Sequence, residues 1–155
     1  MFIINYGIII INKMKAFIFL CVIMNVAFTL DDSLEATTVL KVPNGATSLS
    51  MVVKENEIFS VQLKGNPTTG YQWAMENLDQ LNNVGIRPIN LNERGSGAYI
   101  GDPHEPGLVG FGGTFDFKFR AGTQTNELNT LNFVYKRAWE ATSAKKVQIK
   151  VQITK

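Results

Sequence analysis

The stretch TFDFKFR, residues 114–120, alternates polar and aromatic side chains along its whole length. Successive side chains of a β-strand point to opposite faces, so Phe115, Phe117 and Phe119 fall on the same face. The alternation therefore predicts a strand whose three aromatic rings are turned toward a core.

The same period of two is found on both sides of this strand. It predicts further strands at Glu57–Leu63, Tyr71–Met75, Leu128–Tyr135 and Lys146–Ile153. Weaker strand signals occur at Val39–Val42, Ser48–Val53 and Val84–Ile89.

Short strands spaced roughly 8–12 residues apart are typical of a sandwich or barrel. No clear helical period follows residue 30, and Ala74–Asn83 allows at most one helical turn. We therefore expect an all-β protein, an immunoglobulin-like antiparallel β-sandwich formed by a single domain over residues 31–155. Asn90–Gly107, rich in glycine and proline, is expected to be a long mobile loop.

Residues 1–30 differ from the rest of the chain. Lys13 and Lys15 precede an apolar run at Ala16–Met24, and polar sequence starts at Asp31. This order is typical of a secretory signal peptide, and the run is shorter than the about 20 residues of a membrane span. We expect cleavage between Ala27 and Leu30, with Met14 as an alternative start; a signal anchor over residues 1–24 is the other interpretation.

Removal of this segment changes the charge and the cysteine content. The 15 Lys and Arg residues less Lys13 and Lys15 leave 13, which equals the 13 Asp and Glu residues. A near-zero charge gives no basic patch for nucleic acid. Cys21 is removed with this segment, so the mature domain has no cysteine. Its stability must therefore come from its hydrophobic core, without disulfide bonds. We expect a monomer without membrane association, either secreted or in lysosomal or phagosomal vesicles.

In an antiparallel sandwich, alternate connections lie at the same end, so three loops are expected side by side. They are Lys64–Gly70, Gly107–Gly113 and Lys136–Glu140. The second places Phe111 among glycines, and the third contains Arg137 and Trp139. Since Trp and Arg are enriched in binding hot spots, the three loops predict a recognition surface. In the alternative interpretation, Trp139 packs in the core and the glycines only form turns.

The contents of the three loops, taken in order, resemble a known motif set. Asn66-Pro67-Thr68-Thr69-Gly70-Tyr71, then Gly110-Phe111-Gly112-Gly113, then Arg137-Ala138-Trp139 is similar to chagasin-type inhibitors of papain-like cysteine proteases. The resemblance spans Glu57–Lys155. It implies an immunoglobulin-like sandwich that inhibits such proteases reversibly and tightly.

The resemblance also implies a role for each loop. Thr68 and Thr69 would enter the protease cleft near its catalytic cysteine and histidine. Gly110–Gly113 would lie along one wall of the cleft, and Arg137 and Trp139 along the other. The family usually has proline where this chain has Ala138, which predicts weaker or slower binding to some proteases.

Two other functions, an enzyme and a non-inhibitory binding module, compare less well with the sequence. An enzyme would depend on His104, the sole histidine, with Asp102 nearby, and one histidine without cysteine cannot form a usual zinc site. No lysine or helix start follows Gly110–Gly113 to suggest phosphate binding. We therefore expect no catalysis, metal or cofactor. A non-inhibitory secreted binding or adhesion sandwich remains the alternative, and the loops do not identify a target protease.

Overall fold

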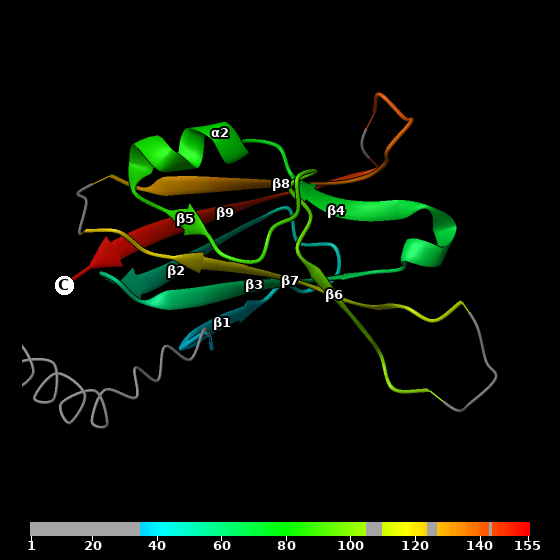
Figure 1. The fold of residues 1–155 in the computed structure, drawn as a ribbon, viewed down its shortest axis with the longest axis horizontal. Coiled ribbons are helices and arrows are strands. Elements are labelled where there is room, and N and C mark those ends of the chain that lie inside the picture. The colour runs from blue at the N-terminus through cyan, green and yellow to red at the C-terminus, as the bar shows by residue number, and fades with distance from the viewer. Residues whose placement is uncertain (1–34, 105–109, 124–126, 143) are drawn as a thin grey trace, which may run out of the picture. The chain divides into compact units, whose positions relative to one another are not determined.

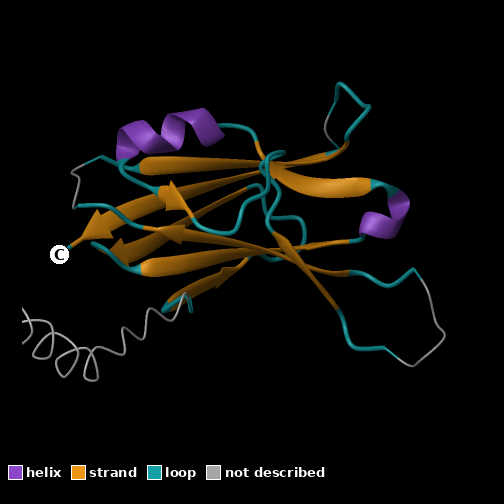
Figure 2. Ribbon diagram, viewed as in Figure 1, coloured by secondary structure: helices purple, strands orange, loops and turns teal. Residues whose placement is uncertain are grey.

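The computed structural model describes residues 35–104, 110–123, 127–142 and 144–155, and shows two β-sheets packed face to face (Figures 1 and 2). The expected signal peptide lies outside the described residues. Among the described residues, no helix is long and apolar enough to cross a membrane. The expected immunoglobulin-like β-sandwich is confirmed.

One sheet has five strands and the other has four. The first contains β1 (Thr38–Lys41), β3 (Ile58–Gly65), β7 (Gly113–Arg120) and β5 (Arg87–Pro88) in that order, with β6 (Ala98–Gly101) also paired to β7. The second contains β2 (Ser48–Lys54), β9 (Lys145–Thr154), β8 (Asn129–Arg137) and β4 (Tyr71–Met75) in that order. In the described part of the chain, three short helical segments lie between strands: η1 (Pro67–Thr69), α2 (Leu78–Leu81) and η2 (Asn82–Val84).

The core lies between the sheets and consists of the alternate residues that the sequence pattern predicts. Phe115, Phe117 and Phe119 are at most 2% exposed. Phe117 meets Phe133 of the opposite sheet edge to face, with ring centroids 4.9 Å apart. Buried aromatic rings of this size supply a large share of the hydrophobic stabilisation. The three-phenylalanine strand is therefore central to the fold, as expected.

The sheets are mixed, which corrects the expectation of a purely antiparallel arrangement. β1 pairs with β3 in parallel, and β2 pairs with β9 in parallel, whereas the other five strand pairs are antiparallel. The chain leaves β1 for β2 in the other sheet and then returns to β3. Two strands separated by one strand of the opposite layer run in the same direction, so β1 and β3 pair in parallel.

The loop expected over Asn90–Gly107 is partly regular in its described portion, residues 90–104. It contains β6, and Asn90 is tied to β7 through Asp116 O (2.9 Å) and the Lys118 N–H (2.8 Å). All four β6 residues are exposed, so no buried face produced an alternating pattern in the sequence. The strand expected at Val84–Ile89 is reduced to the two residues of β5.

We predict that Gly113→Ala destabilises the fold. A Cβ atom at Gly113 would lie 2.5 Å from Tyr99 Oη and nearer still to Ile100 O, because β6 passes directly over this position. We expect the free energy of unfolding to fall by about 1–3 kcal/mol, the usual cost of overpacking, when measured by urea titration.

Gly101→Ala is the matched control. Gly101 pairs with Gly113, yet the nearest atom to its added Cβ would be Tyr99 Cε1 at 4.0 Å. This variant should change the free energy of unfolding by less than about 0.5 kcal/mol. Equal destabilisation by both variants would contradict the role assigned to the close approach of β6.

Candidate functional site

The structure brings the three loops together at one end of the sandwich, where η1 lies at the right of Figure 1. Asn66 Nδ2 of the first loop donates to Gly110 O of the second (2.9 Å). Arg137 Nε of the third donates to Thr69 O of the first (3.1 Å). The first loop is therefore hydrogen-bonded to both of its neighbours. Residues 107–109 of the second loop lie outside the described residues.

The first loop is a single 3-10 turn closed by its own side chains. Asn66 Oδ1 accepts from the Thr68 N–H (3.1 Å) and the Thr68 hydroxyl (2.6 Å), and the Thr69 hydroxyl donates to Asn66 O (2.7 Å). Pro67 occupies the first helical position, and Gly70 ends the turn at φ 80°. Two β-branched residues fit this turn because their hydroxyls satisfy local backbone and capping groups. Thr68 and Thr69 are exposed.

A row of three aromatic rings, Trp73, Tyr135 and Tyr71, extends from the core to the base of this turn. Trp73 is buried and donates through Nε1 to Lys64 O (2.9 Å). The ring of Tyr135 lies 5.0 Å from Trp73 and 5.3 Å from Tyr71, and its hydroxyl accepts from the Asn66 N–H (3.0 Å). Tyr135 thus connects the base of the first loop to the packed core.

The third loop continues this row to the surface. The Arg137 guanidinium lies 4.4 Å from the centre of the Tyr71 ring and 5.9 Å from that of Trp139, and it pairs with Glu140 (3.0 Å). The Glu140 N–H donates to Arg137 O (3.2 Å), which closes a turn with Ala138 as its second residue. Trp139 is 74% exposed, so the interpretation that it packs in the core was wrong.

Trp139 also contacts the first loop. A Cβ atom added at Gly70 would lie 3.0 Å from Trp139 Cη2, so glycine leaves room for the indole. The positive φ of Gly70 is a second reason for glycine at this position.

The second loop presents an aromatic ring on its described portion. Gly110 has φ 87°, and Phe111 is 38% exposed with its ring stacked on that of His104 at 4.8 Å. Gly113, expected in the same surface, is instead a buried residue of β7. Residues of β6 approach Gly113 closely, and Gly113 has almost no exposed surface of its own.

Asp102 and His104, weighed as part of an enzyme, do not form a catalytic pair. The Asp102 carboxylate pairs with Lys64 Nζ at 2.5 Å. His104 Nδ1 contacts the main-chain oxygen of Asp102 (3.0 Å), not its carboxylate. Within the described ranges, no group of three or more His, Cys, Asp or Glu side chains is placed to hold a metal ion.

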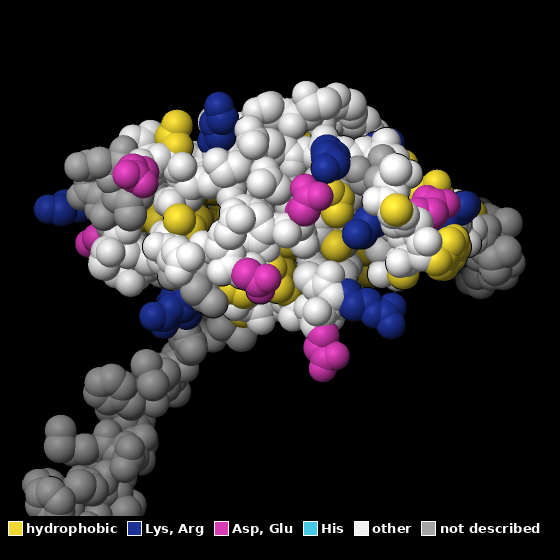
Figure 3. Space-filling view, turned by 90° about the horizontal axis from the view of Figure 1, so that it is seen from above, with side chains coloured by type: hydrophobic (Ala, Val, Ile, Leu, Met, Phe, Trp, Pro, Cys, Tyr) yellow, Lys and Arg dark blue, Asp and Glu magenta, His cyan; other side chains and the backbone are white. Residues whose placement is uncertain are grey.

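Large exposed apolar side chains are concentrated at the loop end of the domain. Of the seven found among the described residues, Tyr99, Ile100, Phe111 and Trp139 belong to the loops or to β6 beside them. Figure 3 shows hydrophobic side chains on the surface at this end, at the right of the picture. Clustered apolar groups on a small domain mark a surface that meets a partner.

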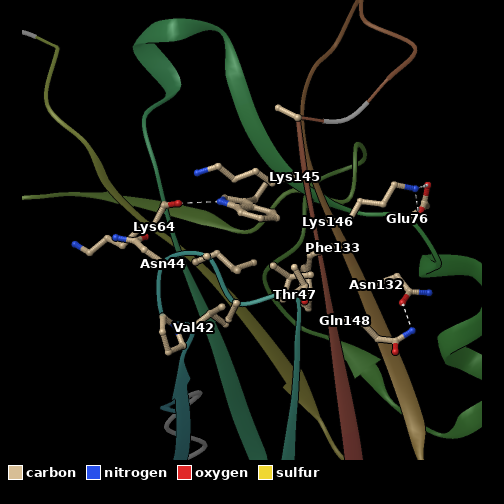
Figure 4. Close-up of a pocket in the computed structure, with 17 residues that line it drawn as sticks. Val42, Asn44, Thr47, Lys64, Glu76, Asn132, Phe133, Lys145, Lys146 and Gln148 are labelled. Atoms are coloured by element: carbon tan, nitrogen blue, oxygen red, sulfur yellow. Dashed lines mark hydrogen bonds and ion pairs between the residues drawn. The ribbon is translucent and has the colours of Figure 1, made fainter.

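A groove of about 540 Å³ lies beside the loops, between the β1–β2 connection and β9 (Figure 4). Buried Leu63, Trp73 and Phe133 are among the residues that line it. Its lysines do not converge, since Lys146 reaches Glu76 (3.3 Å) while Lys64 pairs with Asp102. This arrangement lacks the convergent polar groups of a cofactor or metabolite site.

Sequence reasoning missed two supporting residues, Tyr135 and Glu140. The sequence predicts Tyr135 only as the last residue of a strand, and Glu140 only as a member of a loop. One signal was present: a tyrosine near a strand end commonly needs a polar partner for its hydroxyl when the ring is packed. The identity of that partner, the Asn66 backbone, depends on a contact 69 residues away.

Comparison with known proteins places the chain among inhibitors. The model of the Chagasin family peptidase inhibitor I42 matches residues 52–153. Amoebiasin-1 of Entamoeba histolytica is 34% identical over 96 residues, which cover 62% of this chain and 78% of that protein.

Solved structures show the same fold. The cysteine protease inhibitor EhICP2 from Entamoeba histolytica matches with a TM-score of 0.55 at 20% identity, over 76% of this chain and 96% of that one. Amebosin matches with a TM-score of 0.53 at 26% identity, over 76% and 97% of the two chains. PbICP-C, solved in complex with falcipain-2, matches with a TM-score of 0.50 at 19% identity, over 76% and 99%.

The family match covers most of the sandwich and includes all three loops, and the matched family is one of peptidase inhibitors, not enzymes. The chain belongs to the chagasin family of peptidase inhibitors.

Proposed function

We propose that this protein is a reversible, tight-binding inhibitor of papain-like cysteine proteases that acts as a monomer by filling the active-site cleft with its three loops. The observation that carries the proposal is the closed turn of Thr68 and Thr69, exposed between loops that present Phe111 and Trp139. The complex of PbICP-C with falcipain-2 supports a protease as the partner.

Pre-organisation of the first loop explains how a short turn can bind tightly. Asn66 and the two threonine hydroxyls fix the turn before any protease is met. The loop then loses little conformational entropy on binding. A flexible peptide would lose more, and its affinity would be lower for that reason. A 3-10 turn also differs from the extended backbone of a strand, so it presents no well-placed scissile bond to the catalytic cysteine.

The residues of the second and third loops have two roles: some contact the protease, and others hold the loops in position. Trp139 and Phe111 offer exposed rings that can be buried against the two walls of a cleft. Arg137, in contrast, already donates to Thr69 O and pairs with Glu140. We assign Arg137 mainly to holding Trp139 and the first loop in register, and Trp139 to the contact with the protease.

We also propose that residues 1–30 are a signal peptide, on the basis of Lys13, Lys15 and the apolar run that follows. Protein recovered from the medium or from vesicles should begin between residues 28 and 31 when its N-terminus is sequenced. Full-length chain found only in the cytosol by fractionation would refute the proposal.

We predict that Thr68→Asp weakens inhibition of papain by roughly 100-fold or more, since a buried and unpaired charge costs about 3 kcal/mol or more. The measurement is the inhibition constant of purified residues 31–155, titrated against papain and a cathepsin-like enzyme. The same substitution at exposed Thr123, in the connection between β7 and β8, is the control and should leave inhibition unchanged. Absence of inhibition by the wild type would leave a sandwich whose loops bind another partner.

Ala138→Pro is predicted to strengthen the third loop. Ala138 is the second residue of the turn from Arg137 to Glu140, a position that favours proline, and its N–H donates no hydrogen bond to the described residues. We expect about 0.4–1 kcal/mol more stability in urea unfolding, and an inhibition constant lower by roughly two- to fivefold.

Ala144→Pro provides the contrast for this prediction. The Ala144 N–H donates to Tyr135 O (2.8 Å), so proline there removes a hydrogen bond and should destabilise the domain. If Ala138→Pro also lowered the stability, the turn geometry assigned to the third loop would be wrong.

A further inference from the structure

Strand β6 has an open edge beside the second loop. Among the described residues it pairs only with β7. The Asp102 N–H donates to Gly112 O (3.1 Å), and hydrogen-bonded pairs alternate along an antiparallel ladder. The N–H and C=O groups of Tyr99 and Gly101 therefore face away from β7, toward no described strand.

The edge lacks the usual protection against pairing. Exposed strand edges invite another chain, and proteins commonly block them with charged side chains or proline. β5, which pairs with the same strand β7, consists of Arg87 and Pro88. β6 contains neither a charge nor a proline, and its Tyr99 and Ile100 are 40% and 55% exposed. Of the two strands that pair with β7 on the side opposite β3, β5 has a blocked edge and β6 has an open, apolar edge.

β6 is also continuous with the loop surface. Tyr99 Oη donates to Phe111 O (3.4 Å), and Gly110 O accepts from Asn66 of the first loop (2.9 Å). Figure 1 shows β6 leading out toward the end of the sandwich that carries η1. A partner seated on the three loops would therefore meet the edge of β6.

We propose that β6 is a fourth contact element of the inhibitor, and that its open edge pairs with an extended backbone segment at the rim of the protease cleft. This inference rests on the proposed function. Addition of a strand to a sheet edge uses main-chain hydrogen bonds, which depend little on the partner's sequence. Two outward-facing residues are too few for a stable contact alone, so the edge acts as part of the larger surface formed by the loops.

The test compares Gly101→Pro with Gly101→Ala. Proline removes the outward N–H of Gly101, and it is tolerated at an edge where that N–H faces away from the sheet. Alanine adds a Cβ, for which there is room, and keeps the N–H. We expect the inhibition constant of the proline variant to exceed that of the alanine variant roughly 5- to 30-fold, through faster dissociation.

A second pair of variants covers the case in which Gly101→Pro fails to fold. Ile100→Lys places a charge on the edge and should also weaken inhibition, whereas Val52→Lys on β2, 58% exposed in the wild type, should not. Equal inhibition by both Gly101 variants, or by Ile100→Lys and wild type, would overturn the role of β6.

Failure of this inference is distinguishable from failure of the proposed function. If Thr68→Asp abolishes inhibition while the β6 variants inhibit as the wild type does, the loops bind the protease without β6. If the wild type instead elutes as a dimer that Ile100→Lys converts to a monomer, the edge serves a second copy of this chain and the inference is overturned.

Discussion

The ring of Tyr135 joins the core of the sandwich to the loops at its end. It lies between Trp73, which is buried, and Tyr71, which is half-buried, and its hydroxyl holds the Asn66 N–H. From Tyr71 the row continues through Arg137 to Trp139 on the surface. Stacked aromatic and cationic groups add attraction beyond simple burial. The position of the first loop is thus determined by the same packing that holds the second sheet together.

This coupling explains how a turn made largely of small polar residues can be rigid. Asn66 by itself forms hydrogen bonds with Tyr135, Thr68 and Gly110. Its side chain and backbone therefore link the core, the first loop and the second loop. Arg137 supplies the link to the third loop. Each hydrogen bond in these links has a modest net strength, about 1 kcal/mol. Because they share residues, loss of one loosens the others, and the loops respond as a unit.

The sequence predicted the features that repeat locally and missed those that depend on distant contacts. Phe115, Phe117 and Phe119 were assigned to the core because alternation reports burial directly. The sequence did not predict β6 as a strand, because all of its residues are exposed and no alternation of buried and exposed positions arises. The loop residues from Asn66 to Trp139 are predicted as a binding surface from their order and resemblance, not from periodicity. The hydrogen bond between the Asn66 N–H and the Tyr135 hydroxyl could not be predicted, since no sequence pattern pairs residues 66 and 135.

The distribution of the loops over both sheets has a mechanical consequence for inhibition. The first loop leaves β3 of one sheet and enters β4 of the other, the second enters β7, and the third joins β8 to β9. The spacing between the second and third loops is therefore set by the packing of the sheets, with Phe117 against Phe133 in the core. Packed sheets lie about 10 Å apart and resist compression. In the proposed mode of inhibition, the loops fill a cleft between two walls. Binding would then depend on this spacing, and so on the interior of the sandwich as well as on the loops.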